Sequence, residues 1–274
     1  MSATTIRLAP GVPGLEALGA ACFDDLMGRA RGLATADRER VVSAAAGEVL
    51  VLVPLPGTPD ERGVQHERPR GAGTGLLWVR RFEARPIELL RARLTRPRST
   101  SLAAREWNLI CHLQAHGVGA PQLVALGEGA RGESFVAMRV LEGFETLERW
   151  LAAWTSPSAR RHAVRSLGRA LAALFRSGTW LPALSLADIW IASGPLPLEC
   201  AALELEALRA RSELVRGLQR RRLPSIALTG FRRGRILERV SQRRRRRLLE
   251  ALARELPAHV TRRERLEVLA LSRR

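Results

Sequence analysis

Short apolar runs, each bounded by polar or turn-forming residues, occupy the first half of the chain and predict β-strands. They are rich in the β-branched and aromatic side chains that strands favour. The runs lie at residues 41–42, 49–53, 75–82, 122–125 and 134–140. Residues 54–75 hold proline, glycine and charged residues with few apolar ones, which predicts a loop.

Apolar positions three and four residues apart predict helices elsewhere. The clearest helix is expected over Leu102–His116, where Leu109 and Leu113 share a face, serines precede the first turn and Gly117 follows the last. That face also carries Glu106, and a carboxylate among apolar side chains needs a cationic partner. The same spacing predicts helices at residues 15–27, 147–154 and 159–177.

Strands followed by helices are typical of an α+β protein with a sheet-rich N-terminal half. A length of 274 residues is near the upper limit for one hydrophobic core, so we expect one domain or a two-lobed unit. With 46% hydrophobic and 26% charged residues, a wholly disordered chain is excluded. We expect no transmembrane segment, because no apolar run approaches the roughly 20 residues that span a bilayer. We expect no signal peptide, because the N-terminus lacks a basic region followed by an apolar one. Cys22, Cys111 and Cys200 are widely spaced, which predicts reduced thiols in the cytoplasm.

The net charge is the strongest compositional evidence about the partners of this chain. The chain has 45 basic and 27 acidic residues, a net charge of +18, and every basic residue is arginine. Residues 209–274 contain 21 of these arginines and six acidic residues, so the positive field belongs to the C-terminal quarter. Its natural partners are anions: phosphates, acidic lipids or nucleic acids. Codon bias in a GC-rich genome is an alternative cause of the arginine content.

Several segments resemble the lipopolysaccharide core kinases, the Kdo and heptose kinases. The most specific stretch lies within residues 104–128 and includes AREWNL, LQAHGVGAP and VALGE. Further similar segments are WVRRF at 78–82, FVAMRVLEG at 135–143, LFRSG at 174–178 and GFRRGR at 230–235. The resemblance covers about residues 38–240 and follows the protein-kinase sequence pattern.

The resemblance implies a protein-kinase-like fold of two lobes. We expect an N-terminal helix and extension at residues 1–35 and a sheet-rich N-lobe at 36–141. A mainly helical C-lobe with arginine-rich C-terminal helices is expected at 142–274.

The resemblance also implies transfer of a phosphoryl group from ATP to a sugar hydroxyl, with Mg²⁺ as the metal. The strand lysine that holds the α- and β-phosphates corresponds to Arg80, which could pair with Glu106 on the next helix. Arginine keeps the charge but not the compact geometry of an ammonium, so a purely structural ion pair is the alternative. Trp78 stands where the family has a small residue against adenine, and it would fill that space.

Carboxylates are missing at two further family positions. In residues 181–188 (LPALSLAD) the aspartate that orients the hydroxyl has become Ala183, and Asp188 occupies the downstream asparagine position. The final metal-binding aspartate has become Gly230. Asp188 could still ligate a metal, but one carboxylate is a poor Mg²⁺ site, and a capping role is the alternative. We therefore expect ATP and Mg²⁺ to bind weakly or not at all.

Two other groups of side chains could bind ligands. His112 and His116 lie four residues apart and could face one metal, with ordinary partly exposed histidines as the alternative. An anion-binding surface could form from Arg220, Arg221, Arg222, Arg232, Arg233, Arg235, Arg243, Arg244, Arg245, Arg246 and Arg247. The last five lie in a helical pattern whose apolar side is expected at Ile236, Val240, Leu248, Leu249, Leu252 and Leu256. A solvated charged face is the alternative.

These features predict a lipopolysaccharide-kinase-like pseudokinase that binds or scaffolds at an anionic envelope surface. Its expected partner is an anionic lipid or lipopolysaccharide-type surface, and its expected location is the cytoplasm or the inner face of the membrane. The first alternative is an active kinase that phosphorylates a lipid-linked sugar hydroxyl with Arg80, Glu106 and Asp188 in new roles. The second is a basic protein that associates with nucleic acid and binds with a steep salt dependence.

Overall fold

The computed structural model divides the chain into two units, residues 1–110 with 121–142 and residues 111–120 with 143–274. The residues it describes are 5–9, 24, 27, 41–45, 48–54, 76–83, 101–129, 132–141, 143–153, 157–192, 226–231 and 233–272.

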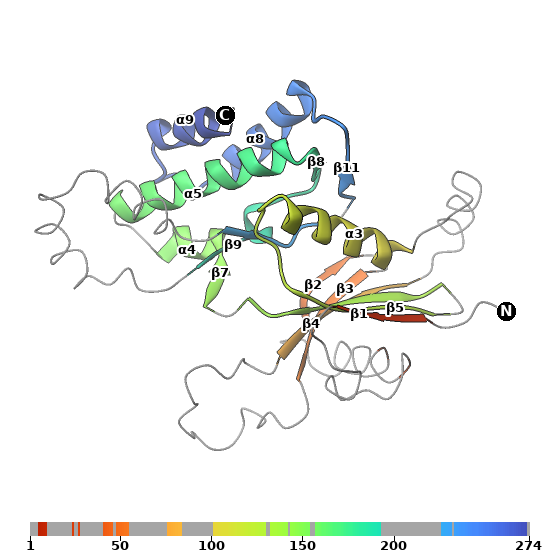
Figure 1. Ribbon diagram of the computed structural model, residues 1–274. Coiled ribbons are helices and arrows are strands. Elements are labelled where there is room, and N and C mark those ends of the chain that lie inside the picture. The colour runs from red at the N-terminus through yellow and green to blue at the C-terminus, as the bar shows by residue number, and fades with distance from the viewer. Residues whose placement is uncertain are drawn as a thin grey trace, which may run out of the picture. The chain divides into compact units, whose positions relative to one another are not determined.

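A six-stranded antiparallel sheet forms the first unit (Figure 1). Its strands lie in the order β1-β5-β6-β4-β3-β2. Their bounds are β1 Thr5–Leu8, β2 Val41–Ala45, β3 Glu48–Pro54, β4 Leu76–Phe82, β5 Leu123–Glu128 and β6 Ser134–Arg139. The strands predicted from the apolar runs are thus confirmed. Strand β1 was missed: it lies in the region assigned to a helix and extension, and it pairs with β5 at the edge of the sheet.

Side chains alternate across β4, which gives the sheet two different faces. Leu77 and Val79 pack with Val53, Phe135 and Ala137 in a fully buried cluster. Met27 joins this cluster and is one of two described residues of the predicted N-terminal helix, the rest of which lies outside the described residues. Trp78, Arg80 and Phe82 therefore lie on the opposite face of β4.

Helix α3 (Leu102–Ala115) agrees with the predicted helix at both ends. Ser101 Oγ accepts a hydrogen bond from Ala104 N at 3.0 Å and so caps the first turn. Gly117 follows the last turn with φ of 69°, a left-handed conformation that glycine adopts without steric cost. Within this helix the division between the two units falls after Ile110.

The second unit is mainly helical, with two small antiparallel sheets (Figure 1). Its helices are α4 Leu147–Ala153, α5 Pro157–Arg176, the 3₁₀ turn η3 Leu186–Asp188, α8 Gln242–Glu255 and α9 Arg262–Leu271. One sheet has the order β10-β9-β7, with β10 Ile226–Leu228, β9 Ile189–Ala192 and β7 Phe144–Thr146. The other pairs β11 (Arg235–Ile236) with β8 (Thr179–Trp180). The α+β architecture is confirmed.

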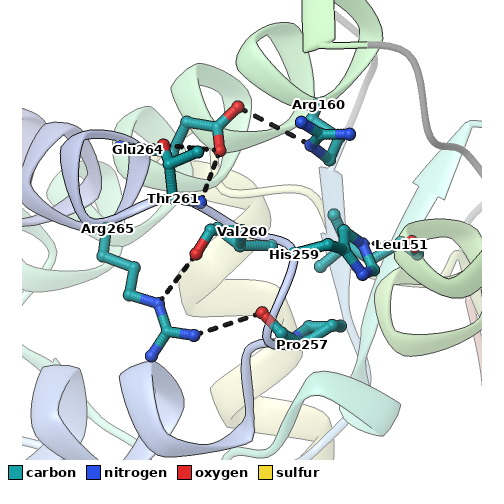
Figure 2. A network of polar contacts seen from close by, with 8 residues as sticks. All are labelled: Leu151, Arg160, Pro257, His259, Val260, Thr261, Glu264 and Arg265. Carbon is teal, nitrogen blue, oxygen red and sulfur yellow. Dashed lines mark hydrogen bonds and ion pairs between the residues drawn. The ribbon is translucent and has the colours of Figure 1, made fainter.

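A polar network joins the C-terminal helices (Figure 2). Arg265 donates hydrogen bonds to the carbonyls of Val260 and Pro257, both at 3.1 Å, and to two carbonyls at the end of α8. Glu264 completes a capping box with Thr261 and lies 3.7 Å from Arg160 of α5. These two arginines are therefore structural, despite the arginine-rich surroundings. None of the described helices is long and apolar enough to cross a membrane.

Candidate functional site

Arg80 and Glu106 form a buried ion pair that joins β4 to α3. Arg80 Nη1 lies 3.1 Å from Glu106 Oε1 and donates a hydrogen bond to Oε2 at 3.2 Å. Both residues are about 95% buried, since their relative exposures are 4% and 5%. The structure thus brings together the two residues that correspond to the phosphate-binding lysine and its glutamate.

Trp78 lies two residues before Arg80 on the same face of β4, and its side chain is 2% exposed. Its cross-strand neighbours are Leu52 and Met138. A large indole is therefore buried beside the ion pair, at the position where the family pattern has a small residue.

In residues 181–188, the segment that corresponds to the catalytic loop, Asp188 stabilises a tight turn. Its Oδ2 accepts hydrogen bonds from Ser185 Oγ at 2.6 Å and from Ser185 N at 3.1 Å. In return, Asp188 N donates to Ser185 O at 3.1 Å. Ala183, at the position of the hydroxyl-orienting aspartate, is exposed and carries no functional group. Asp188 thus acts as a local cap within the η3 turn.

Gly230 packs directly against Asp188. A Cβ atom at residue 230 would lie 2.6 Å from both Cβ and Cγ of Asp188 and 2.8 Å from Oδ2, well inside van der Waals contact. The neighbouring backbone is fixed as well, because Thr229 N and Thr229 Oγ1 donate to Asp188 O at 2.9 and 3.1 Å. Asp188 in this conformation therefore leaves no room for any side chain at position 230, including the aspartate of the family pattern.

A second carboxylate holds the same loop, and sequence reasoning missed it. Glu255, at the end of α8, accepts a hydrogen bond from Leu186 N at 2.7 Å. The two residues are 69 positions apart in the chain, and no motif links them. The backbone donors of residues 185 and 186 are thus satisfied by Asp188 and Glu255, which stabilises the loop in its present form.

The described residues at this loop do not fit Mg²⁺. Asp188 is the one carboxylate at the positions that correspond to the family's metal ligands, and its Oδ2 caps the η3 turn through Ser185. Among the residues that the structure describes, no group of three or more His, Cys, Asp or Glu side chains could hold a metal ion. Mg²⁺ is a hard cation that prefers several oxygen ligands.

The two predicted metal-binding histidines have protein partners. His112 Nε2 donates to Ser177 O at 2.7 Å, and His116 Nδ1 donates to His112 O at 2.8 Å. Their ring centroids are 4.2 Å apart. This geometry supports ordinary partly exposed histidines, because one ring nitrogen of each is engaged with a backbone carbonyl and no group of three or more described His, Cys, Asp or Glu side chains could hold a metal ion.

The structure separates the run Arg243–Arg247 into different roles. Arg245 is half-buried: its Nε donates to Val240 O at 3.1 Å, and its guanidinium carbon lies 5.3 Å from the centre of the Phe175 ring. Arg246 pairs with Glu250 at 2.6 Å, and this hydrogen bond raises the pKa of Arg246 above its ordinary value. The remaining arginines of the run are exposed.

One residue near the arginine run was assigned wrongly from the sequence. Ile236 was expected on the apolar side of the helix, but it lies in β11 and is 47% exposed, because α8 begins only at Gln242. Arg233 and Arg235 are exposed nearby in the chain. Arg220, Arg221, Arg222 and Arg232 lie outside the described residues.

Comparisons with known proteins concern the sequence pattern and the fold. A model of the lipopolysaccharide kinase (Kdo/WaaP) family matches residues 73–195. The solved structure of WaaP in complex with acyl carrier protein has a similar fold, with a TM-score of 0.55 and 18% sequence identity. The match covers 86% of this chain and 78% of that one. A comparison with curated protein sequences found no match. Residues 73–195 therefore carry the sequence pattern of the lipopolysaccharide kinase (Kdo/WaaP) family, in a chain whose fold is similar to that of WaaP.

Proposed function

We propose that this lipopolysaccharide-kinase-like protein is a pseudokinase that binds or scaffolds at an anionic envelope surface. The observation that carries the proposal is the contact between Asp188 and Gly230. In the family pattern, side chains at these two positions would hold Mg²⁺. Here Asp188 caps the η3 turn, and residue 230 is a glycine packed against it.

Phosphoryl transfer depends on positioned groups and on compensation of charge, with little covalent chemistry by the protein. The chain has lost the hydroxyl-orienting carboxylate at Ala183 and the metal-binding carboxylate at Gly230. Glu255 does not replace either of them, because it accepts a hydrogen bond from the loop backbone. Without these groups, the protein contributes little to stabilising the transition state.

The residues at the nucleotide positions support the same conclusion. The Arg80 guanidinium is bound to Glu106 in a buried pair, and separating them would leave a buried carboxylate uncompensated. The Trp78 side chain is buried on the same sheet face. A structural role for these residues accounts for their burial and contacts.

An active kinase remains the second candidate, and one observation favours it. The Arg80–Glu106 pair keeps the position and the charges of the family's lysine–glutamate pair. In that case the hydroxyl would be oriented by a carboxylate outside the family positions.

Titration with ATP by calorimetry, with and without Mg²⁺, separates the two candidates. Because the chain is arginine-rich, tripolyphosphate at the same ionic strength is the control for binding to the phosphate chain alone. We expect no Mg²⁺-dependent binding, and any heat with ATP should be matched by tripolyphosphate and removed by salt. Micromolar ATP binding that requires Mg²⁺ and exceeds that of tripolyphosphate would overturn the pseudokinase proposal. Thermal shift at fixed salt provides an independent readout.

A further inference from the structure

Exposed arginines are concentrated on one stretch of the second unit, residues 233–247, here called the arginine face. Glu238 is the one exposed acidic residue in this stretch. The exposed arginines are Arg233, Arg235, Arg239, Arg243, Arg244, Arg246 and Arg247.

Several of these arginines lie in the first turns of α8, where positive charges destabilise an isolated helix. The N-terminus of a helix carries a partial positive charge, and the first turn of α8 contains no acidic residue. Arg243 and Arg247 are also four residues apart, where like charges repel. No described acidic residue lies within ion-pair distance of Arg243, Arg244 or Arg247. A polyanionic partner would relieve this repulsion.

The helix aligns three of its arginines in one outward row. With 100° per residue, Arg243, Arg247 and Arg254 fall within about 40° of one another, opposite the buried Leu248, Leu249 and Leu252. The exposed Glu250 falls on the same side of the helix, and its carboxylate pairs with Arg246. Arg254 is exposed like the other two. The row is roughly 16 Å long at the helical rise per residue. Such a straight row suits an extended, flat array of anions.

Ile236 indicates which polyanion fits. This side chain is 47% exposed and lies between Arg235 and Arg239 in the chain. An exposed aliphatic side chain within an arginine-rich segment is typical of surfaces that lie on membranes, where the apolar group enters the interface. Residues 233–247 contain no aromatic side chain, so they offer no stacking platform for bases and no aromatic anchor for a protein partner.

We propose that the arginine face docks on an anionic phospholipid bilayer, with its guanidinium groups at the headgroup phosphates and Ile236 in the interface. This inference rests on the anionic-surface role proposed above and assigns it to one surface and one partner. Cosedimentation with vesicles of phosphatidylcholine and phosphatidylglycerol, against vesicles of phosphatidylcholine alone, tests it on the full chain.

The decisive variant is Arg243→Gln with Arg247→Gln. The matched control is Arg262→Gln with Arg263→Gln, which removes the same charge from two exposed arginines of α9. At about fivefold per arginine, the α8 variant should partition onto anionic vesicles roughly 25-fold less than the wild type. The α9 control should change less than twofold. Ile236→Ser should weaken binding several-fold without changing its dependence on salt, because it removes no charge.

Each other outcome has a definite meaning. Equal losses in the α8 and α9 variants would overturn the docking assignment and leave the general surface role intact. Absence of wild-type binding to anionic vesicles would overturn both, independently of the nucleotide titration. Tighter binding to duplex DNA or to acyl carrier protein than to vesicles, at the same ionic strength, would also overturn the docking assignment. Helical circular dichroism, unchanged in every variant, checks that the chain is folded.

Discussion

Gly230 and Asp188 look in the sequence like two separate departures from the kinase pattern, but in the structure they form one packed pair. The Asp188 carboxylate closes the η3 turn with Ser185 and lies where a side chain at residue 230 would begin. Restoring an aspartate at residue 230 would therefore clash with the turn before it could bind a metal.

We predict that Gly230→Ala destabilises the chain by about 1–3 kcal/mol, because the added methyl group overpacks against Asp188. The measurement is the free energy of unfolding from denaturant titration. In the Asp188→Gly background all three close contacts are absent, so the cost of Gly230→Ala should fall there.

Gly117→Ala is the control for this cycle. Gly117 has φ of 69°, and a Cβ atom added to it would meet nothing within 4 Å, so its substitution costs backbone strain alone. Asp188→Gly should leave that cost unchanged. Equal effects of Gly230→Ala in both backgrounds would contradict the packing explanation.

At the scale of elements, the Arg80–Glu106 pair fixes α3 against β4. Its two residues are 26 positions apart. The sequence indicated that Glu106 needs a cation, because it lies on an apolar helix face, and the resemblance to the lipopolysaccharide core kinases pointed to Arg80. The ends of α3 were also predictable, since Ser101 and Gly117 are local capping signals. Strand β1 was missed although Ile6 and Leu8 alternate with Thr5 and Arg7 and pack against the core, because an alternation of four residues is too short to identify a strand without its partner β5.

We predict that Arg80→Met lowers the free energy of unfolding by about 3–5 kcal/mol, because it removes the cation that lies 3.1 Å from the buried Glu106 carboxylate. The double variant Arg80→Met with Glu106→Leu should be more stable than Arg80→Met alone. Arg246→Gln breaks an exposed pair with Glu250 and should change stability little. If the double variant were less stable than Arg80→Met alone, Glu106 would stabilise the fold by some interaction other than its charge pairing with Arg80.

At the scale of the whole molecule, the net charge of +18 acts against compactness through repulsion among the arginines. The arginine face concentrates part of this repulsion in one short segment. Stability of the fold alone does not explain so many exposed arginines there. A protein that gains function from such a surface loses some stability in its free form.

We therefore predict that salt raises the melting temperature of the free chain, because it screens this repulsion. Arg243→Gln with Arg247→Gln should melt about 0.5–2 °C higher than the wild type at low salt, and the difference should shrink as salt is added. Differential scanning calorimetry over a salt series measures both effects. A lower melting temperature of this variant at low salt would argue that the two arginines have stabilising partners.

The sequence by itself determined the α+β class, the main strands and helices, and the family pattern. These features are encoded locally, in the periodicity of apolar residues, in capping residues and in short motifs. The tertiary structure decided what the remaining polar groups do. It placed Asp188 in the space beside Gly230, brought Glu255 to Leu186 from 69 positions away, and left Ile236 exposed in β11. These contacts depend on how distant segments pack, and a hydrogen bond or a steric contact acts only between atoms that the fold has brought within a few ångströms.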